Sequence, residues 1–171
     1  MIHLTLKLVG LEPLGPVEGL VPNNMFTKHE RLFPKVTVDI VVVYARSFLL
    51  VRRSSKNSSG RGLWATVGGH LRKNETLENA AARILERETG ITVDKSKFKL
   101  LGVNQYFDEK VHCVSMVFKT TSPSKSVVLD DTSSEYGWFT RESLPPSTIS
   151  HYRTMLLLGG FDVGSDNGSN E

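Results

Sequence analysis

Residues 68–91, which read GGHLRKNETLENAAARILERETGI, decide the fold. At a helical spacing of about 100° per residue, the apolar residues of 77–89 form one stripe made of Leu77, Ala81, Ile84 and Leu85. Thr76 is placed to cap the start of this helix, and Gly90 to end it. The glycine pair at 68–69 follows a short predicted strand at 63–67. The stretch therefore predicts a strand, a glycine turn, a loop and an amphipathic helix.

Glu88 falls in the middle of the apolar stripe. A carboxylate against a core needs a cation or hydrogen bonds, unless it escapes to solvent or caps a loop near the helix end. The glycine pair lets a backbone carbonyl approach the inner face of the helix, because glycine has no Cβ. A carbonyl oxygen and a carboxylate are hard donors that suit Mg²⁺ or Mn²⁺. Gly68 and Glu88 are therefore candidate metal ligands.

Outside this stretch the patterns favour strands over helices. Strands are predicted at 36–43, 48–51, 98–107, 111–120, 126–129 and 135–140, and short helices at 141–144 and 147–158. Because the strands do not alternate regularly with helices, the fold class is α+β, with helices flanking a mixed sheet. We expect an N-terminal arm over 1–35 with one strand at 2–9, a domain over 36–158, and a disordered tail over 159–171.

Composition limits the class of protein. The 171 residues suit one domain, and the single cysteine, Cys113, allows no internal disulfide. The net charge of +3 is too small to indicate nucleic-acid wrapping. The longest apolar run, at 40–45, is far shorter than the about 20 residues that cross a bilayer. With no signal-peptide pattern, we expect a soluble, cytoplasmic protein without membrane or nucleic-acid partners.

The spacing of polar residues around the helix resembles the box of the Nudix superfamily. The positions that fit are Gly69, Glu75, Arg83, Leu85, Glu88, Gly90 and Ile91. Ile84 and Arg87 stand where two metal-binding glutamates of the family would be. The same loss marks the branch of GDP-mannose mannosyl hydrolases, which this chain also resembles over about 33–144.

The resemblance implies a Nudix fold, with a mixed sheet between helices, and Mg²⁺-dependent hydrolysis, with Mn²⁺ as a possible substitute. The implied substrate is a nucleoside diphosphate sugar of the GDP-mannose type, attacked at the anomeric carbon to release sugar and nucleoside diphosphate. By position, Gly68 and Glu88 bind the metal, and Glu75 pairs with Arg83. The residues that the resemblance places at the substrate are Arg53 and Arg83, which face the diphosphate, and Asp39, His70 and Tyr136. The branch is dimeric, so a homodimer is also implied.

Simpler interpretations stand beside these assignments. Arg53 and Arg83 could be solvated surface arginines, Asp39 could have a capping or edge role, and His112 is interpreted as a packed core histidine.

The general base of the branch is not matched. Its glutamine ligand and histidine base align with Thr132 and Ser133 here, and neither hydroxyl takes a proton at neutral pH unaided. Asp130, Asp131 and Glu135 are nearby substitutes, of which Asp131 and Glu135 join Glu88, Arg83 and Arg53 as catalytic candidates. Two alternatives follow: a pyrophosphohydrolase that cuts a nucleoside diphosphate derivative between its phosphates, and a non-catalytic, nucleotide-binding Nudix domain.

Overall fold

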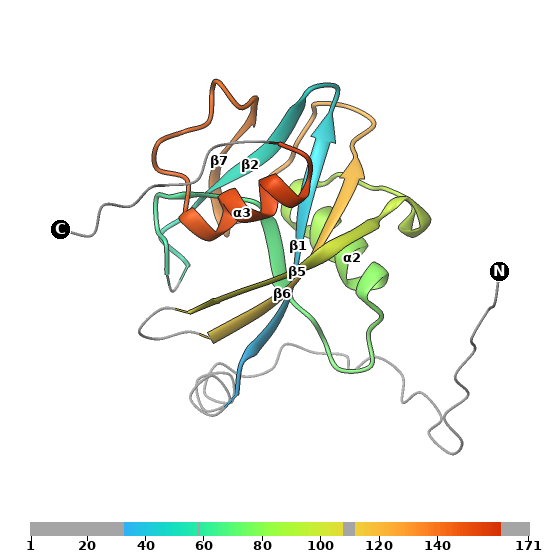
Figure 1. Ribbon diagram of the computed structural model, residues 1–171. Coiled ribbons are helices and arrows are strands. Elements are labelled where there is room, and N and C mark those ends of the chain that lie inside the picture. Colours follow the sequence, from blue (N-terminus) through green and yellow to red (C-terminus); the bar gives the residue numbers. More distant parts are fainter. Residues whose placement is uncertain (1–32, 58, 108–111, 162–171) are drawn as a thin grey trace, which may run out of the picture.

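The computed structural model describes residues 33–57, 59–107 and 112–161 (Figure 1). The elements over these residues are β1 (Lys35–Tyr44), β2 (Ser47–Arg53), β3 (Trp64–Ala65), β4 (Val67–His70), α2 (Leu77–Thr89), the short 3-10 helix η1 (Lys95–Lys97), β5 (Lys99–Phe107), β6 (His112–Thr121), β7 (Ser133–Phe139) and α3 (Ser150–Leu158). No helix in the described ranges is long and apolar enough to cross a membrane.

The sheet is organised around β1. Along one edge β1 pairs in parallel with β6, which in turn pairs antiparallel with β5. Its other edge is shared, because β4 pairs antiparallel with residues 37–40 and β2 with residues 43–44. Beyond that point β2 pairs with β3 and β7. The mixed sheet therefore forks beside the middle of β1.

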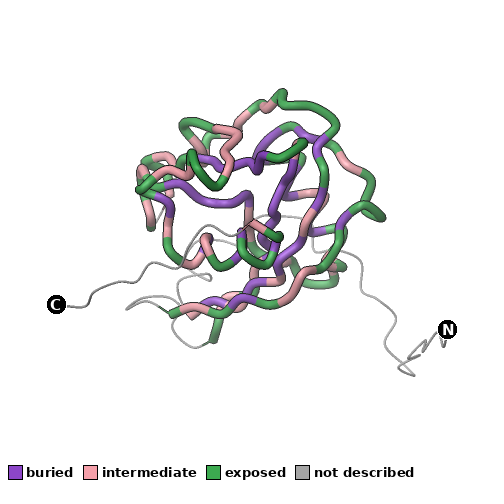
Figure 2. Tube along the Cα trace, turned by 45° about the horizontal axis from the view of Figure 1, so that its top comes forward, coloured by how far each residue is buried: buried purple, intermediate pink, exposed green. Residues whose placement is uncertain are grey.

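The two faces of the sheet are covered by different helices. Val38, Ile40 and Val42 of β1 belong to the same buried cluster as the inner face of α2. Val41 and Val43 point the other way and belong to the cluster that contains α3. Figure 1 shows the two helices on either side of β1, and Figure 2 shows the buried residues concentrated in the central strands. The predicted α+β fold with helices flanking a mixed sheet is confirmed.

Helix α2 has the predicted bounds and caps. The Asn79 N–H donates to the Thr76 side chain at 3.3 Å, which caps the first turn. Gly90 ends the helix in the left-handed region, with φ 65°, and its N–H donates to the Glu86 carbonyl at 2.8 Å. A Cβ at position 90 would lie 3.2 Å from the Cβ of Val128, so the chain also passes very close to this glycine.

The strand predicted at 63–67 is divided into β3 and β4, and the glycine pair lies within β4. The break falls at Thr66, whose buried hydroxyl lies 3.4 Å from the Asp39 carboxylate, to which it donates, and 3.7 Å from the Met155 sulfur. The break allows β3 to pair with β2 while β4 pairs with β1.

Two other predicted elements are wrong. Residues 126–129 form no strand, because the Val128 N–H donates to the carbonyl of Thr89 at 2.8 Å and so caps the end of α2 instead of joining the sheet. Residues 141–144 form a turn, in which Ser143 bonds back to Thr140, and two prolines follow at 145–146. The last helix begins at Ser150 instead of 147, because the preceding residues hydrogen-bond to Trp64.

The predicted arm over 1–35 and its strand at 2–9 lie outside the described residues, apart from 33–35. Of the predicted tail over 159–171, only 159–161 are described. Here the ring of Phe161 packs edge-on against Phe48, with 4.8 Å between centroids. Phe161, in the predicted tail, therefore contacts the buried core.

The Gly68→Ala substitution should destabilise the protein. A Cβ at Gly68 would lie 2.0 Å from Oδ1 of Asp39, a buried carboxylate held by three hydroxyls. The cost of such overpacking is about 1–3 kcal/mol in the free energy of unfolding, measurable by urea denaturation. Gly102→Ala is the control, since its nearest neighbour would be 4.0 Å away. Equal stability of the two variants would contradict the close packing of β4 on β1.

Candidate active site

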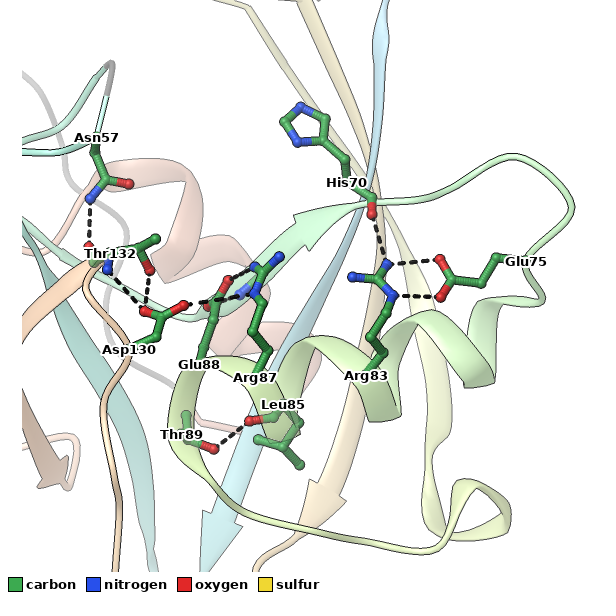
Figure 3. Close-up of polar contacts among 11 residues, drawn as sticks. Asn57, His70, Glu75, Arg83, Leu85, Arg87, Glu88, Thr89, Asp130 and Thr132 are labelled. Atoms are coloured by element: carbon green, nitrogen blue, oxygen red, sulfur yellow. Dashed lines mark hydrogen bonds and ion pairs between the residues drawn. The ribbon is translucent and has the colours of Figure 1, made fainter. Parts of the chain in front are cut away.

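The Glu88 carboxylate lies beside Gly68 at the fork of the sheet. Figure 3 shows its side chain at the end of α2, next to Arg87. Glu88 lies in the last turn of α2, is only 6% exposed, and points inward as the helical spacing predicts. Its Oε2 accepts a hydrogen bond from the backbone N–H of Gly68 at 3.3 Å. The other carboxylate oxygen, Oε1, accepts from the guanidinium of Arg87. The buried carboxylate therefore contacts β4 and a neighbouring cation.

Burial dominates the electrostatics of Glu88. It raises the pKa of this carboxyl to about 7, although Arg87 and the Gly68 N–H both favour the ionised form. The net rise shows that these two donors do not fully replace water.

Glu75 and Arg83 form a two-pronged ion pair at the start of the box. Arg83 donates from Nε to Oε1 at 2.6 Å and from Nη2 to Oε2 at 2.7 Å, and Nη2 also reaches the His70 carbonyl at 3.1 Å. Partial burial alone would raise the pKa of Glu75, but Arg83 and the Arg72 N–H hold the pKa below its usual value. The pairing expected for Glu75 is present, and it ties the loop after β4 to α2.

The carboxylates of Asp130 and Glu88 both contact the guanidinium of Arg87. Its Oδ2 lies 3.7 Å from the Nε of Arg87, and its backbone N–H lies 3.4 Å from the Glu88 carbonyl, to which it donates. Oδ1 accepts from the Thr132 N–H at 2.9 Å and from the Thr132 hydroxyl at 2.6 Å. The segment that caps α2 thus brings a second carboxylate to the site.

Asp39 lies opposite Gly68 in the register of β1 and β4. It is 4% exposed, in an interior strand, so the edge role weighed for it from sequence does not apply. Ser115 donates to Oδ2, as does Thr37 at 3.4 Å, and Thr66 donates to Oδ1 at 3.4 Å. Burial raises the pKa of Asp39 to about 6, despite these hydroxyls and the charge of Arg53.

The other predicted site residues lie around this centre with partners of their own. Arg53 donates from Nε to the Ser59 carbonyl at 3.0 Å. Asp131 pairs with Lys56 at 2.6 Å, and Glu135 with Arg52 at 3.2 Å, in exposed ion pairs. His70 and Tyr136 are exposed.

His112 is not a core histidine. It is half-buried at the start of β6, where its Nε2 lies 2.8 Å from Nε2 of Gln105 and its ring stacks on Phe107.

The sequence did not predict the ion pairs that Arg87 forms with Glu88 and Asp130. It also favoured Asp131 and Glu135 over Asp130 as catalytic candidates. The signal for Arg87 was present, because an arginine at a family glutamate position next to a buried acid is an available counter-ion. The placement of Asp130 depends on how the segment after β6 crosses the end of α2, which periodicity does not encode.

The donor set suits a single hard cation. No three His, Cys, Asp or Glu side chains gather into a metal-binding group anywhere in the described ranges. The oxygens that the structure brings together are the carboxylates of Glu88 and Asp130, on either side of Arg87. The carbonyl of Gly68 stays a predicted ligand, and the other positions are left to water and phosphate oxygens, as Mg²⁺ prefers. Ile84 is fully buried in the core, so that family position offers no ligand.

The stability of the protein should depend on the titration of Asp39. Because its folded pKa is raised from 3.8 to about 6, the protonated form is favoured by folding, and this contribution is lost as pH rises through about 6. A shift of about two units corresponds to about 3 kcal/mol. Asp39→Asn, neutral throughout, should therefore gain stability relative to wild type by up to that amount between about pH 4 and pH 7. Urea denaturation across this range measures the difference, and a constant difference would contradict the shift.

Comparison with known proteins agrees with this geometry. The NUDIX domain model matches residues 33–158. The chain is 32% identical over 126 residues to an ADP-ribose pyrophosphatase of Methanocaldococcus jannaschii, covering 72% of each chain. A MutT NUDIX hydrolase of Burkholderia pseudomallei superposes with a TM-score of 0.66 at 27% identity, covering 74% of this chain and 98% of that one.

A second solved structure is a bifunctional NMN adenylyltransferase/ADP ribose pyrophosphatase of Francisella tularensis, complexed with AMP and a manganese ion. It has a TM-score of 0.60 and 26% identity, with coverage of 83% of this chain and 47% of that one. Together with the box residues at the fork of the sheet, these matches show that the chain belongs to the Nudix hydrolase family.

Proposed function

We propose that this Nudix hydrolase cleaves a nucleoside diphosphate derivative of the ADP-ribose type between its two phosphates. The observation that carries the proposal is the inward-facing Glu88 beside the glycine pair, with the Glu75–Arg83 pair intact. The names of the relatives from Methanocaldococcus jannaschii and Francisella tularensis support this substrate class. This was the alternative weighed from sequence, and it is better supported than cleavage of a GDP-mannose-type substrate.

Glu88 and the Gly68 carbonyl are the proposed ligands of one Mg²⁺ ion, which Mn²⁺ could replace. When bound, such an ion neutralises the diphosphate and increases the acidity of a coordinated water. One ion is proposed because the remaining family positions hold Ile84, which is buried among apolar side chains, and Arg87, which is a cation.

We assign the other steps, which are holding the loop, orienting water and binding the diphosphate, to side chains around this centre. Arg83, fixed by Glu75, keeps the loop after β4 against α2. Asp130 is better placed than Asp131 or Glu135 to orient the attacking water and accept its proton, because only Asp130 shares a contact with Glu88, through Arg87. Arg53 supplies positive charge for the diphosphate, and Asp39, His70 and Tyr136 stay predicted substrate contacts. A cytoplasmic homodimer also stays a prediction.

A second candidate reaction is attack at the anomeric carbon of a nucleoside diphosphate sugar. The replacement of two box carboxylates by Ile84 and Arg87 favours it, because a leaving nucleoside diphosphate needs only one counter-ion.

Hydrolysis in oxygen-18 water distinguishes the two reactions. The purified chain is incubated with Mg²⁺, ADP-ribose and GDP-mannose, and the products are identified by mass. We expect the label on a phosphate, because the water oxygen bonds to one phosphorus while the bond from that phosphorus to the bridging oxygen breaks and the other phosphate leaves. Label on the sugar would instead establish the second candidate. Inactivity across a wider panel of nucleotide sugars and dinucleotides would contradict both and favour a nucleotide-binding Nudix domain.

Glu88→Gln should lower kcat by about 100-fold or more, the scale of a lost transition-state electrostatic contact. The variant keeps the shape of the side chain and removes its charge. Glu86→Gln is the matched control, since Glu86 lies two residues earlier on the exposed side of the same helix. Steady-state kinetics with Mg²⁺ measure both. Activity of Glu88→Gln equal to that of Glu86→Gln would contradict the metal assignment.

A further inference from the structure

Arg87 lies where the centre would hold its cation. Its guanidinium contacts Oε1 of Glu88 and lies 3.7 Å from Oδ2 of Asp130, so one cation connects the two carboxylates (Figure 3). It also lies against the glycine pair, because a Cβ at Gly69 would be 3.4 Å from the Arg87 Nη2. The positive group therefore lies between the end of α2, β4 and the segment that carries Asp130.

This contact is not an ordinary surface ion pair. The side chain of Arg87 is 45% exposed but the side chain of Glu88 only 8%, so the Glu88 carboxylate is stabilised by this cation where it has little contact with water. An arginine that only complemented the helix C-terminus would have no need of a buried partner. Because its outer part is exposed, Arg87 can move away from the pair into solvent or onto a bound anion without repacking the core.

The balance of charge determines when Arg87 can move away from Glu88. When both carboxyl groups are ionised, the single positive charge of Arg87 faces two negative charges, and one negative charge is left over. A divalent ion that binds the Glu88 carboxylate must displace the guanidinium from Oε1 and so break the Arg87–Glu88 ion pair. A diphosphate removes that penalty, because guanidinium groups bind phosphate oxygens through paired donors.

We propose that Arg87 competes with the divalent cation for Glu88, and that the diphosphate of the substrate relieves this competition by drawing Arg87 away. The proposal rests on the substrate class given under Proposed function. Metal and nucleotide then bind cooperatively, each raising the affinity for the other by the same factor. Release of Arg87 also frees Asp130, so the water-orienting carboxylate becomes available only when the substrate is bound.

Mn²⁺ binding, followed by the EPR signal of the free ion, tests this without turnover. The full chain is titrated with Mn²⁺ alone and with the uncleavable nucleotide α,β-methylene-ADP, and a titration without protein corrects for chelation by the nucleotide. In wild type we expect the nucleotide to tighten Mn²⁺ binding by about 10-fold or more, within the usual range of coupling between sites. Without nucleotide, Arg87→Gln should bind Mn²⁺ about 10-fold more tightly than wild type. Nucleotide should then tighten Mn²⁺ binding less in this variant than in wild type, because only the direct contact of phosphate oxygens with the ion is left.

Two further variants test whether the higher Mn²⁺ affinity of Arg87→Gln comes from the Glu88 carboxylate. Arg46→Gln removes the same charge from the exposed turn between β1 and β2 and should bind Mn²⁺ like wild type. Arg87→Gln combined with Glu88→Gln should lose the gain, because it acts through the Glu88 carboxylate.

The proposal is overturned if Arg87→Gln binds Mn²⁺ no more tightly than wild type. It is also overturned if the nucleotide leaves wild-type Mn²⁺ affinity unchanged, a measurement that needs no variant to fold. These results are separate from the fate of the proposed function. A chain that shows both expected Mn²⁺ effects yet cleaves no substrate in the oxygen-18 assay would contradict the function and leave the competition by Arg87 standing.

Discussion

The arrangement of this protein depends on two strands sharing one edge of β1. Because β2 takes residues 43–44 and β4 takes residues 37–40, the two strands must separate, and the separation leaves room for the end of α2. β4 can approach β1 this closely only because position 68 has no side chain, since Asp39 fills the space that a Cβ would need. The buried carboxylates of Asp39 and Glu88 both lie beside Gly68, on different elements that this pairing brings together.

The site departs from its family in a way that the packing explains. Ile84 is part of the core between α2 and the sheet, so the loss of a glutamate there is compensated by apolar contact. The other lost glutamate is replaced by Arg87, which changes the sign of the charge beside Glu88. A cluster of acids that would repel one another without metal has become an arrangement of two carboxylates and a guanidinium that holds together in its absence.

Sequence patterns predicted the parts of the structure that local physics controls. The bounds and caps of α2, the presence of strands β1 and β2, and the inward direction of Glu88 follow from periodicity, capping residues and glycine positions. The failures are residues whose partners are distant in sequence. Residues 126–129 have the composition of a strand but hydrogen-bond to the end of α2. The predicted strand at 63–67 is interrupted at Thr66, whose hydroxyl contacts Asp39 and Met155. Arg87 was visible as a departure from the box, but only tertiary contacts show that it connects Glu88 to Asp130.

Val128 passes close to Gly90, and this contact limits which residues can replace the glycine. Position 90 requires a left-handed backbone, which asparagine tolerates among the larger residues, but any Cβ there would press on the Cβ of Val128 at 3.2 Å. Replacement of the glycine therefore requires the backbone at Val128 to move outward by a few tenths of an ångström, because a smaller side chain at position 128 would keep its Cβ. A change at position 90 is therefore coupled to the path of the segment around position 128, and homologues that lack the glycine should hold that segment further from the end of the helix.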